Sequence, residues 1–138
     1  MVNEAKTEAI VRKILEKHKE KYEKETEDSV IIEEKQSDIP IIDKLLQTAS
    51  KRGSGAGYPE FIISFPNKDC VIVIECKPDL KKHISKTLNK YADYAVDGAL
   101  LYSSYLSKEF DVISIGVSGE TEHETRIDNF IQIRGEKS

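Results

Sequence analysis

The spacing of hydrophobic residues along the chain predicts three helices. In the first, from about Asn3 to Lys24, apolar residues recur at helical spacing among lysines and glutamates. The second is predicted to open at Asp38 or Pro40 and to end before Gly53. The third is the longest, from about Leu80 to Lys108, with inward positions predicted at Ile84, Leu88, Tyr91, Ala95, Ala99, Leu100 and Leu106.

Strand patterns fill most of the remaining chain. The strong ones cover Glu60–Phe65, Cys70–Lys77, Asp111–Val117 and Thr125–Ile133, and Ser29–Lys35 is a candidate short strand. Residues 66–69 (Pro-Asn-Lys-Asp) have turn chemistry, so the first two strong strands are expected to form a hairpin. The second strand of that hairpin, CVIVIECK, is apolar on both faces and is expected at the centre of the sheet. This order of elements predicts an α/β fold, a mixed β-sheet flanked by helices in a single domain.

Composition narrows the class of protein further. A chain of 138 residues, 38% hydrophobic and 33% charged, is expected to fold around one core. It has no run of about 20 apolar residues and no signal-peptide pattern at its start, so a cytoplasmic location without membrane association is expected. The net charge of −4 argues against a protein that coats nucleic acid through bulk charge. A DNA-handling domain of this charge is expected to need another domain or subunit to hold DNA.

Candidate chemistry lies at the end of the apolar strand CVIVIECK. Strand alternation puts Val73, Glu75 and Lys77 on one face, so two opposite charges stand together where an apolar strand ends. Glu60 opens the preceding strand, and a hairpin brings it close to Glu75. Two carboxylates suit Mg²⁺, and the adjacent lysine can orient water or offset phosphate charge. The alternative is an exposed Glu–Lys ion pair, which contributes little.

The order of these features resembles a known nuclease superfamily. A glycine-rich loop (Lys51–Gly57), Pro59-Glu60, a hairpin and then Glu75-Cys76-Lys77 are similar to the PD-(D/E)XK pattern. More narrowly, GYPEFIIS, VIVIECK and YADYAVDGALLYSSYLSKEFDVISIGVSG resemble the N-terminal nuclease domain of restriction-modification polypeptides that also carry an adenine methyltransferase. The resemblance spans about Gly53 to Gly119. It implies a restriction-endonuclease-like fold for residues 1–138, with N-terminal helices in 1–52 and the catalytic sheet and helix in 53–134.

The resemblance also implies a site. A divalent metal, Mg²⁺ with Mn²⁺ as a substitute, is expected on Glu60, Glu75 and the backbone carbonyl of Cys76, with Lys77 completing the catalytic set. The sequence departs from the family pattern at Glu60, where aspartate is usual, and the longer side chain could shift the metal or require a bridging water. The first helix of such folds can add an acid. Glu8 lies on its inward stripe, as a ligand or as a simple boundary residue.

DNA contacts are expected on the helix after Lys77. Related nucleases often carry Gln-x-x-x-Tyr there, and the nearest match runs from Lys90 to Tyr94, with Lys in the Gln position. Lys82, Lys86, Lys90 and Tyr94 fall at four-residue steps, a helix stripe able to meet phosphates. A solvated lysine face is the competing interpretation.

Three functions remain open at this point. The leading hypothesis is a Mg²⁺-dependent endodeoxyribonuclease domain that cuts double-stranded DNA, with methyltransferase and specificity domains in the same or an associated chain. The second is a catalytically silent nuclease-like module for DNA binding or protein interaction. The third is a nuclease for branched or damaged DNA.

Overall fold

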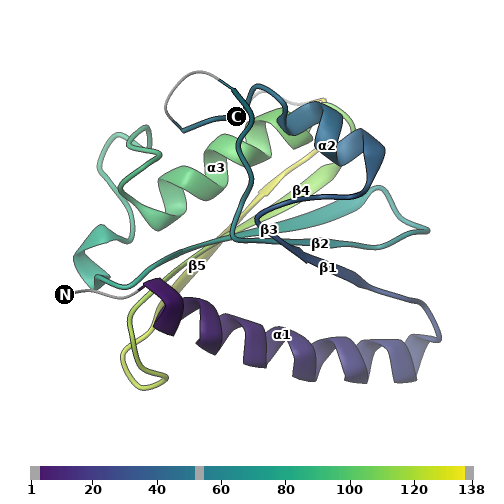
Figure 1. The fold of residues 1–138 in the computed structure, drawn as a ribbon, viewed down its shortest axis with the longest axis horizontal. Coiled ribbons are helices and arrows are strands. Elements are labelled where there is room, and N and C mark those ends of the chain that lie inside the picture. Colours follow the sequence, from purple (N-terminus) through teal and green to yellow (C-terminus); the bar gives the residue numbers. More distant parts are fainter. Residues whose placement is uncertain (1–3, 52–54, 136–138) are drawn as a thin grey trace.

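The fold is built on one five-stranded sheet with the strand order β1-β2-β3-β4-β5 (Figure 1). The computed structural model describes residues 4–51 and 55–135. In chain order the elements are α1 (Glu4–Thr26), β1 (Ile31–Glu34), α2 (Pro40–Leu46), β2 (Phe61–Ser64), β3 (Cys70–Lys77), the 3₁₀ turn η1 (Leu80–Lys82), α3 (Ala95–Leu106), β4 (Asp111–Ser118) and β5 (Arg126–Gln132).

The sheet is mixed, as the order of elements predicts. Strands β1, β2 and β3 are antiparallel neighbours, and the hairpin pairs Phe61 with Ile74 and Ser64 with Val71. Strand β3 then pairs in parallel with β4, and β4 pairs antiparallel with β5. A parallel pair needs a long crossover, which here contains η1 and α3. The predicted central place of CVIVIECK is therefore confirmed.

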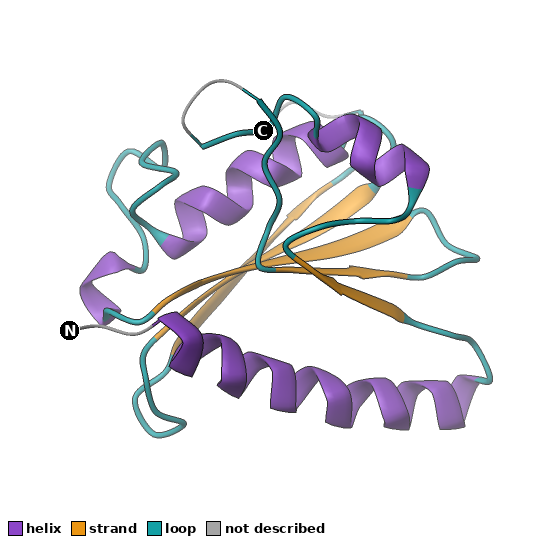
Figure 2. Ribbon diagram, in the orientation of Figure 1, coloured by secondary structure: helices purple, strands orange, loops and turns teal. Residues whose placement is uncertain are grey.

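Helices cover both faces of the sheet (Figure 2). On the α1 face the core includes Val11, Phe61, Ile74 and Cys76. On the opposite face, α2 and α3 pack through residues that include Leu46, Ile62, Val73, Tyr102 and Leu106. Because both cores share one sheet, the chain forms a single domain. None of the helices in the described part of the chain has the length and apolar character that crossing a membrane requires.

The predicted helix from Leu80 to Lys108 is wrong in its first half. Only η1 and α3 are helical, and Leu88 has a left-handed φ of 60° that interrupts any helix between them. The buried carboxylate of Asp97 accepts hydrogen bonds from the backbone N–H groups of Ser85 and Lys90 and from the Ser85 hydroxyl. These bonds hold residues 83–94 as an irregular loop, since a side chain supplies partners that a helix would take from its own backbone.

Gly116 on β4 lies directly against Val96 of α3, and a side chain there is expected to destabilise the fold. A Cβ atom on Gly116 would lie 2.6 Å from Val96 Cγ2 and 2.8 Å from the Val96 nitrogen. Gly116→Ala is therefore expected to lower the free energy of unfolding by about 1–3 kcal/mol, measured by urea denaturation. Asn129→Ala, at an exposed position of β5, is the control and should stay within about 0.5 kcal/mol of the wild type. Equal midpoints for Gly116→Ala and the wild type would contradict this packing.

Candidate active site

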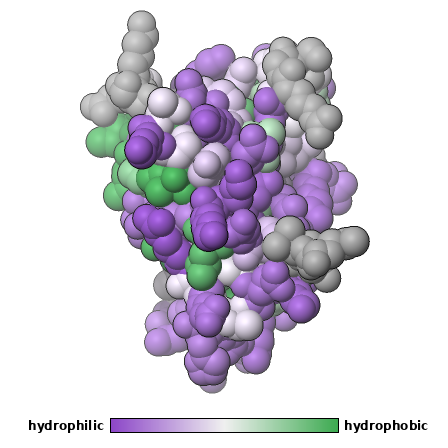
Figure 3. Space-filling view, turned by 90° about the vertical axis from the view of Figure 1, so that its left-hand side faces the viewer, coloured by the Kyte–Doolittle hydropathy of each residue, from purple (hydrophilic) through white to green (hydrophobic). Residues whose placement is uncertain are grey.

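Four glutamates gather at the end of the sheet where β3 and β4 finish and α1 begins, at the left of Figure 1. Glu60 immediately precedes β2, Glu75 lies near the end of β3, and Glu4 and Glu8 come from the first turns of α1. The surface of this end of the molecule is largely hydrophilic, with small apolar patches (Figure 3). The structure thus brings together the three acids that the sequence singled out, Glu8, Glu60 and Glu75, and adds Glu4.

Glu75 is a fully buried carboxylate with two partners. Its Oε1 accepts a hydrogen bond from the backbone N–H of Glu60 at 2.9 Å, and its Oε2 pairs with the Lys51 ammonium. Burial raises the pKa of Glu75, and the charge of Lys51 opposes that rise. Space around Oε2 is restricted, because a Cβ atom on Gly98 would lie only 3.1 Å away. Glycine at position 98 of α3 therefore leaves room for the carboxylate.

Glu60 carries a largely buried carboxylate whose pKa is raised. Its side chain is 13% exposed, and its Oε2 is buried without a hydrogen-bond donor in the described part of the chain. One oxygen each from Glu60, Glu4 and Glu8 lie within 4.8 Å of one another. Burial first, and then the charges and contacts of Glu75, Glu4 and Glu8, raise the pKa of Glu60 to about 8. Carboxylates held this close repel one another unless a proton or a cation lies between them.

Lys35 is one cation that faces this group. It follows β1 with a left-handed φ of 57°, and its N–H points to the carbonyls of Pro59 and Glu60. Its ammonium lies 2.9 Å from Glu8 Oε1 and 3.6 Å from Glu60 Oε2. The hydrogen bond to Glu8 is the main cause that raises the pKa of Lys35. Because the Lys35 side chain is 59% exposed, solvent screens these pairs and they contribute little to stability.

The donor set fits a hard divalent cation. Mg²⁺ prefers carboxylate and carbonyl oxygens, and Glu60 Oε2 is a buried acceptor without a hydrogen bond in the described residues. The predicted ligands Glu60 and Glu75 are neighbours through the Glu60 N–H, while the Glu60 carboxylate groups with Glu4 and Glu8. Cys76 of β3 pairs with Val117 of β4 on one side. On its other side it has no partner in β2, because the ladder between β2 and β3 ends at Ile74. The acids whose oxygens lie close enough together to share an ion are Glu4, Glu8 and Glu60, and binding of that ion by Glu75 and by the Cys76 carbonyl stays a prediction.

Lys77 stands beside this acidic group. Strand alternation puts it on the same face of β3 as Glu75, where burial raises the pKa of the carboxyl and the charges of Lys51 and then Lys77 oppose that rise. Lys77 also lines an open pocket of about 330 Å³ with Glu4, Asp79 and Lys82. Of the four clustered glutamates only Glu4 lines this pocket, and Asp93 adds a third carboxylate to those of Glu4 and Asp79. The predicted side-by-side arrangement of Glu75 and Lys77 is therefore present at the end of β3.

The predicted DNA-contact helix is not formed. Lys90 lies in the exposed loop before α3, and Tyr94 is the residue before the first turn of that helix. The Lys82 ammonium lies 5.1 Å from the centre of the Tyr94 ring. Lys82, Lys86, Lys90 and Tyr94 consequently form no helix stripe, because residues 83–94 are irregular. Contact of Lys90 and Tyr94 with DNA stays a prediction.

Sequence reasoning missed both lysines that pair with the acids. Lys51 opens the glycine-rich loop, and Lys35 follows β1; each pairs with an acid far away in sequence. Glu4 lies one helical turn before Glu8 on the same face of α1, and this spacing is the signal that could have found it.

A hydrogen-bonded Ser-His-Asp trio lies nearby, but its serine is too buried to act as a nucleophile. His83 Nδ1 lies 2.7 Å from Ser118 Oγ, and its Nε2 lies 2.8 Å from Asp128 Oδ2. Burial lowers the pKa of His83. Ser118 and His83 are both fully buried, so no substrate reaches the hydroxyl. These hydrogen bonds instead connect the loop after η1 to β4 and β5.

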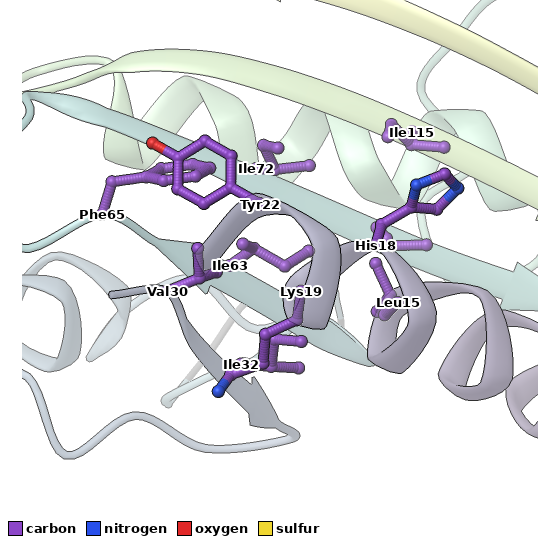
Figure 4. A pocket seen from close by; sticks show the side chains of 11 residues that line it. Leu15, His18, Lys19, Tyr22, Val30, Ile32, Ile63, Phe65, Ile72 and Ile115 are labelled. Carbon is purple, nitrogen blue, oxygen red and sulfur yellow. The ribbon is translucent and has the colours of Figure 1, made fainter. Parts of the chain in front are cut away.

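A separate apolar pocket of about 190 Å³ lies between the later turns of α1 and the sheet (Figure 4). Leu15, His18, Lys19 and Tyr22 of α1 line one side, and the sheet contributes residues such as Ile63. No carboxylate lines it, so it is distinct from the acidic site.

Comparisons with known proteins give no relative. No protein-family model matches the chain, and neither a curated protein nor a solved structure matches it.

Proposed function

We propose that this chain is a Mg²⁺-dependent endodeoxyribonuclease domain with a restriction-endonuclease-like fold. The observation that carries the proposal is the meeting of Glu60 and Glu75, with the Glu60 N–H 2.9 Å from Glu75 Oε1, beside Lys77 at the end of the central strand. Acids from two adjacent strands and one lysine are the arrangement that the Pro-Glu and Glu-x-Lys motifs predict. The extra acids of α1 increase the negative charge that attracts a cation.

Each residue has a role in this proposal. Glu60 and Glu75, with the Cys76 carbonyl, hold the ion, and Glu8 supports it from α1. When bound, Mg²⁺ lowers the pKa of a coordinated water and offsets the charge of the phosphate. Lys77 neutralises charge on the scissile phosphate and orients the attacking water. The products are a 3′-hydroxyl and a 5′-phosphate, as the family resemblance implies.

The substrate is double-stranded DNA held with the help of other domains. The net charge of −4 gives the domain little affinity of its own for a polyanion. Methyltransferase and specificity domains, in the same or an associated chain, would supply recognition, and the setting would be the cytoplasm. Lys90, in the exposed loop before α3, and Tyr94, at the start of that helix, are the proposed local phosphate contacts.

Crystals soaked in Mn²⁺ test the metal site directly. The expected result is an anomalous peak within about 2.5 Å of carboxylate oxygens from both Glu60 and Glu75. Glu75→Gln is the matched variant and should lose the peak, because an amide is a weaker ligand than a carboxylate. A peak on exposed acids alone, or none at high Mn²⁺, would contradict the proposal.

One observation favours a second candidate, a silent nuclease-like module. Lys51 already pairs with Glu75, and Lys35 lies between Glu8 and Glu60, so lysines balance part of the acidic charge without a metal. Such a module would bind DNA or protein without cutting. It predicts no Mn²⁺ site and no cleavage of any DNA in Mg²⁺, including branched DNA.

A further inference from the structure

We propose that Lys51 is a built-in competitor for the metal site: its ammonium occupies the Glu75 oxygen that a divalent cation needs, and cation binding displaces it. This inference rests on the proposed function. It adds a residue from the glycine-rich loop to the site and assigns it control over metal affinity.

The contacts of Glu75 show what Lys51 occupies. The carboxylate is 0% exposed, so water does not solvate it. Its Oε1 is taken by the Glu60 N–H, and its Oε2 by the Lys51 ammonium. A buried carboxylate needs a counter-charge, and Lys51 supplies it in the metal-free protein. A cation that ligates Glu75 must therefore displace this ammonium or share Oε2 with it.

The surroundings of Lys51 make sharing unfavourable. Its side chain is only 18% exposed, and its ammonium lies 5.7 Å from the centre of the Tyr102 ring. A Cβ atom on Gly98 would lie 3.3 Å from Lys51 Cε and 3.1 Å from Glu75 Oε2, so this side of the carboxylate is closely packed. An ammonium and a divalent cation at one buried oxygen repel strongly, because the surroundings screen charge poorly. Binding of the cation and pairing with Lys51 therefore exclude each other.

Lys35 provides the contrast within the same site. It also pairs with acids, but its side chain is 59% exposed and is free to move its charge into water. Lys51 is largely buried and pairs with a fully buried acid, so displacing its ammonium costs more free energy than displacing that of Lys35. Of these two lysines, Lys51 is therefore the one expected to weaken metal binding.

Mn²⁺ titration of the wild type and of Lys51→Met, followed by the electron paramagnetic resonance of free Mn²⁺, tests the competition. Loss of the competing charge is expected to tighten Mn²⁺ binding about tenfold or more. Lys51→Arg, which keeps the charge, is expected to bind as weakly as the wild type. The matched control is Lys108→Met, because the Lys108 ammonium lies 5.5 Å from the Tyr105 ring centre and makes the same kind of contact away from the acids.

The outcomes separate this inference from the function on which it rests. Absence of Mn²⁺ binding in every variant overturns the metal site itself, and the competition with it. Mn²⁺ binding by the wild type that is unchanged or weaker in Lys51→Met overturns the role of Lys51 and leaves the metal site standing.

A measurement on the unmodified protein covers the case in which Lys51→Met does not fold. Amine acetylation, read by mass spectrometry residue by residue, is expected to be slow at Lys51 and several-fold faster once Mn²⁺ saturates the site. Lys108 should react at the same rate in both states. A Lys51 that stays equally protected in the Mn²⁺-bound protein overturns the proposal.

Discussion

Lys77→Ala is expected to reduce DNA cleavage by about 10³-fold without weakening metal binding. Lys77 shares a face of β3 with Glu75 and lines the pocket beside the acids, so its ammonium is available to the phosphate. Removing one group that stabilises charge in a transition state lowers the rate by about 10²–10³-fold, and loss of water orientation adds to this. The measurement is single-turnover cleavage of plasmid DNA in Mg²⁺, with the partner domains present where the isolated chain does not hold DNA.

Lys82→Ala is the matched control for Lys77→Ala. Lys82 lines the same pocket, but it lies in η1, and its ammonium lies over the Tyr94 ring. It is expected to change cleavage by less than about tenfold through weaker phosphate attraction. Equal cleavage by Lys77→Ala and the wild type would show that Lys77 takes no part in the chemistry.

Faster cutting of four-way junctions than of plain duplex by the wild type would favour the hypothesis of a nuclease for branched DNA.

The sheet was predictable because each strand carries its own local signal. Cys70–Lys77 was predicted with the bounds that the structure has, since an apolar run flanked by a turn and by Pro78 leaves little freedom. The hairpin register then follows from the turn at residues 66–69, and this register brings Glu60 next to Glu75. This part of the site could be predicted because it depends on contacts that lie close together in sequence.

The crossover could not be predicted in the same way. Residues 83–94 have enough apolar positions to imitate a helix, and periodicity alone gave no reason to break it. The loop exists because Asp97 and His83 are buried and bind backbone and side-chain groups of distant segments. Such bonds form only once β4, β5 and α3 are in place, so no local pattern in the sequence reports them.

The lysines of the site were missed for a related reason. Glu8 was found because a carboxylate on the inward stripe of an amphipathic helix is unusual. Lysines in exposed segments are common, so nothing in the sequence marks Lys35 or Lys51 as paired with acids. Their pairing depends on the position of α1 over the sheet and on the path from α2 to β2.

Glu60→Gln is expected to stabilise the metal-free protein in alkaline solution. The pKa of Glu60 is about 8 in the folded protein and near 4.5 in an unfolded chain, so the folded state binds more protons between these values. Stability therefore falls as pH rises from about 4.5 to about 8, and the full cost of the charged group is present above pH 8. Glutamine removes this cost. The gain at pH 9 is at most about 5 kcal/mol and disappears near pH 4, as measured by urea denaturation in EDTA.

Glu34→Gln provides a control of opposite sign. The Arg12 guanidinium donates hydrogen bonds to Glu34 and lowers the pKa of that carboxyl. Its stabilising effect is present above about pH 4.5 and is lost as pH falls through the lowered pKa, so Glu34→Gln should be less stable than the wild type at neutral pH. Mg²⁺ should replace protons among the acids around Glu60, and so stabilise the wild type more at pH 9 than at pH 6. If Glu60→Gln were no more stable than the wild type at pH 9 in EDTA, the Glu60 carboxylate would not be held among unbalanced acids. That crowding of acids is the feature that favours cation binding at this end of the sheet.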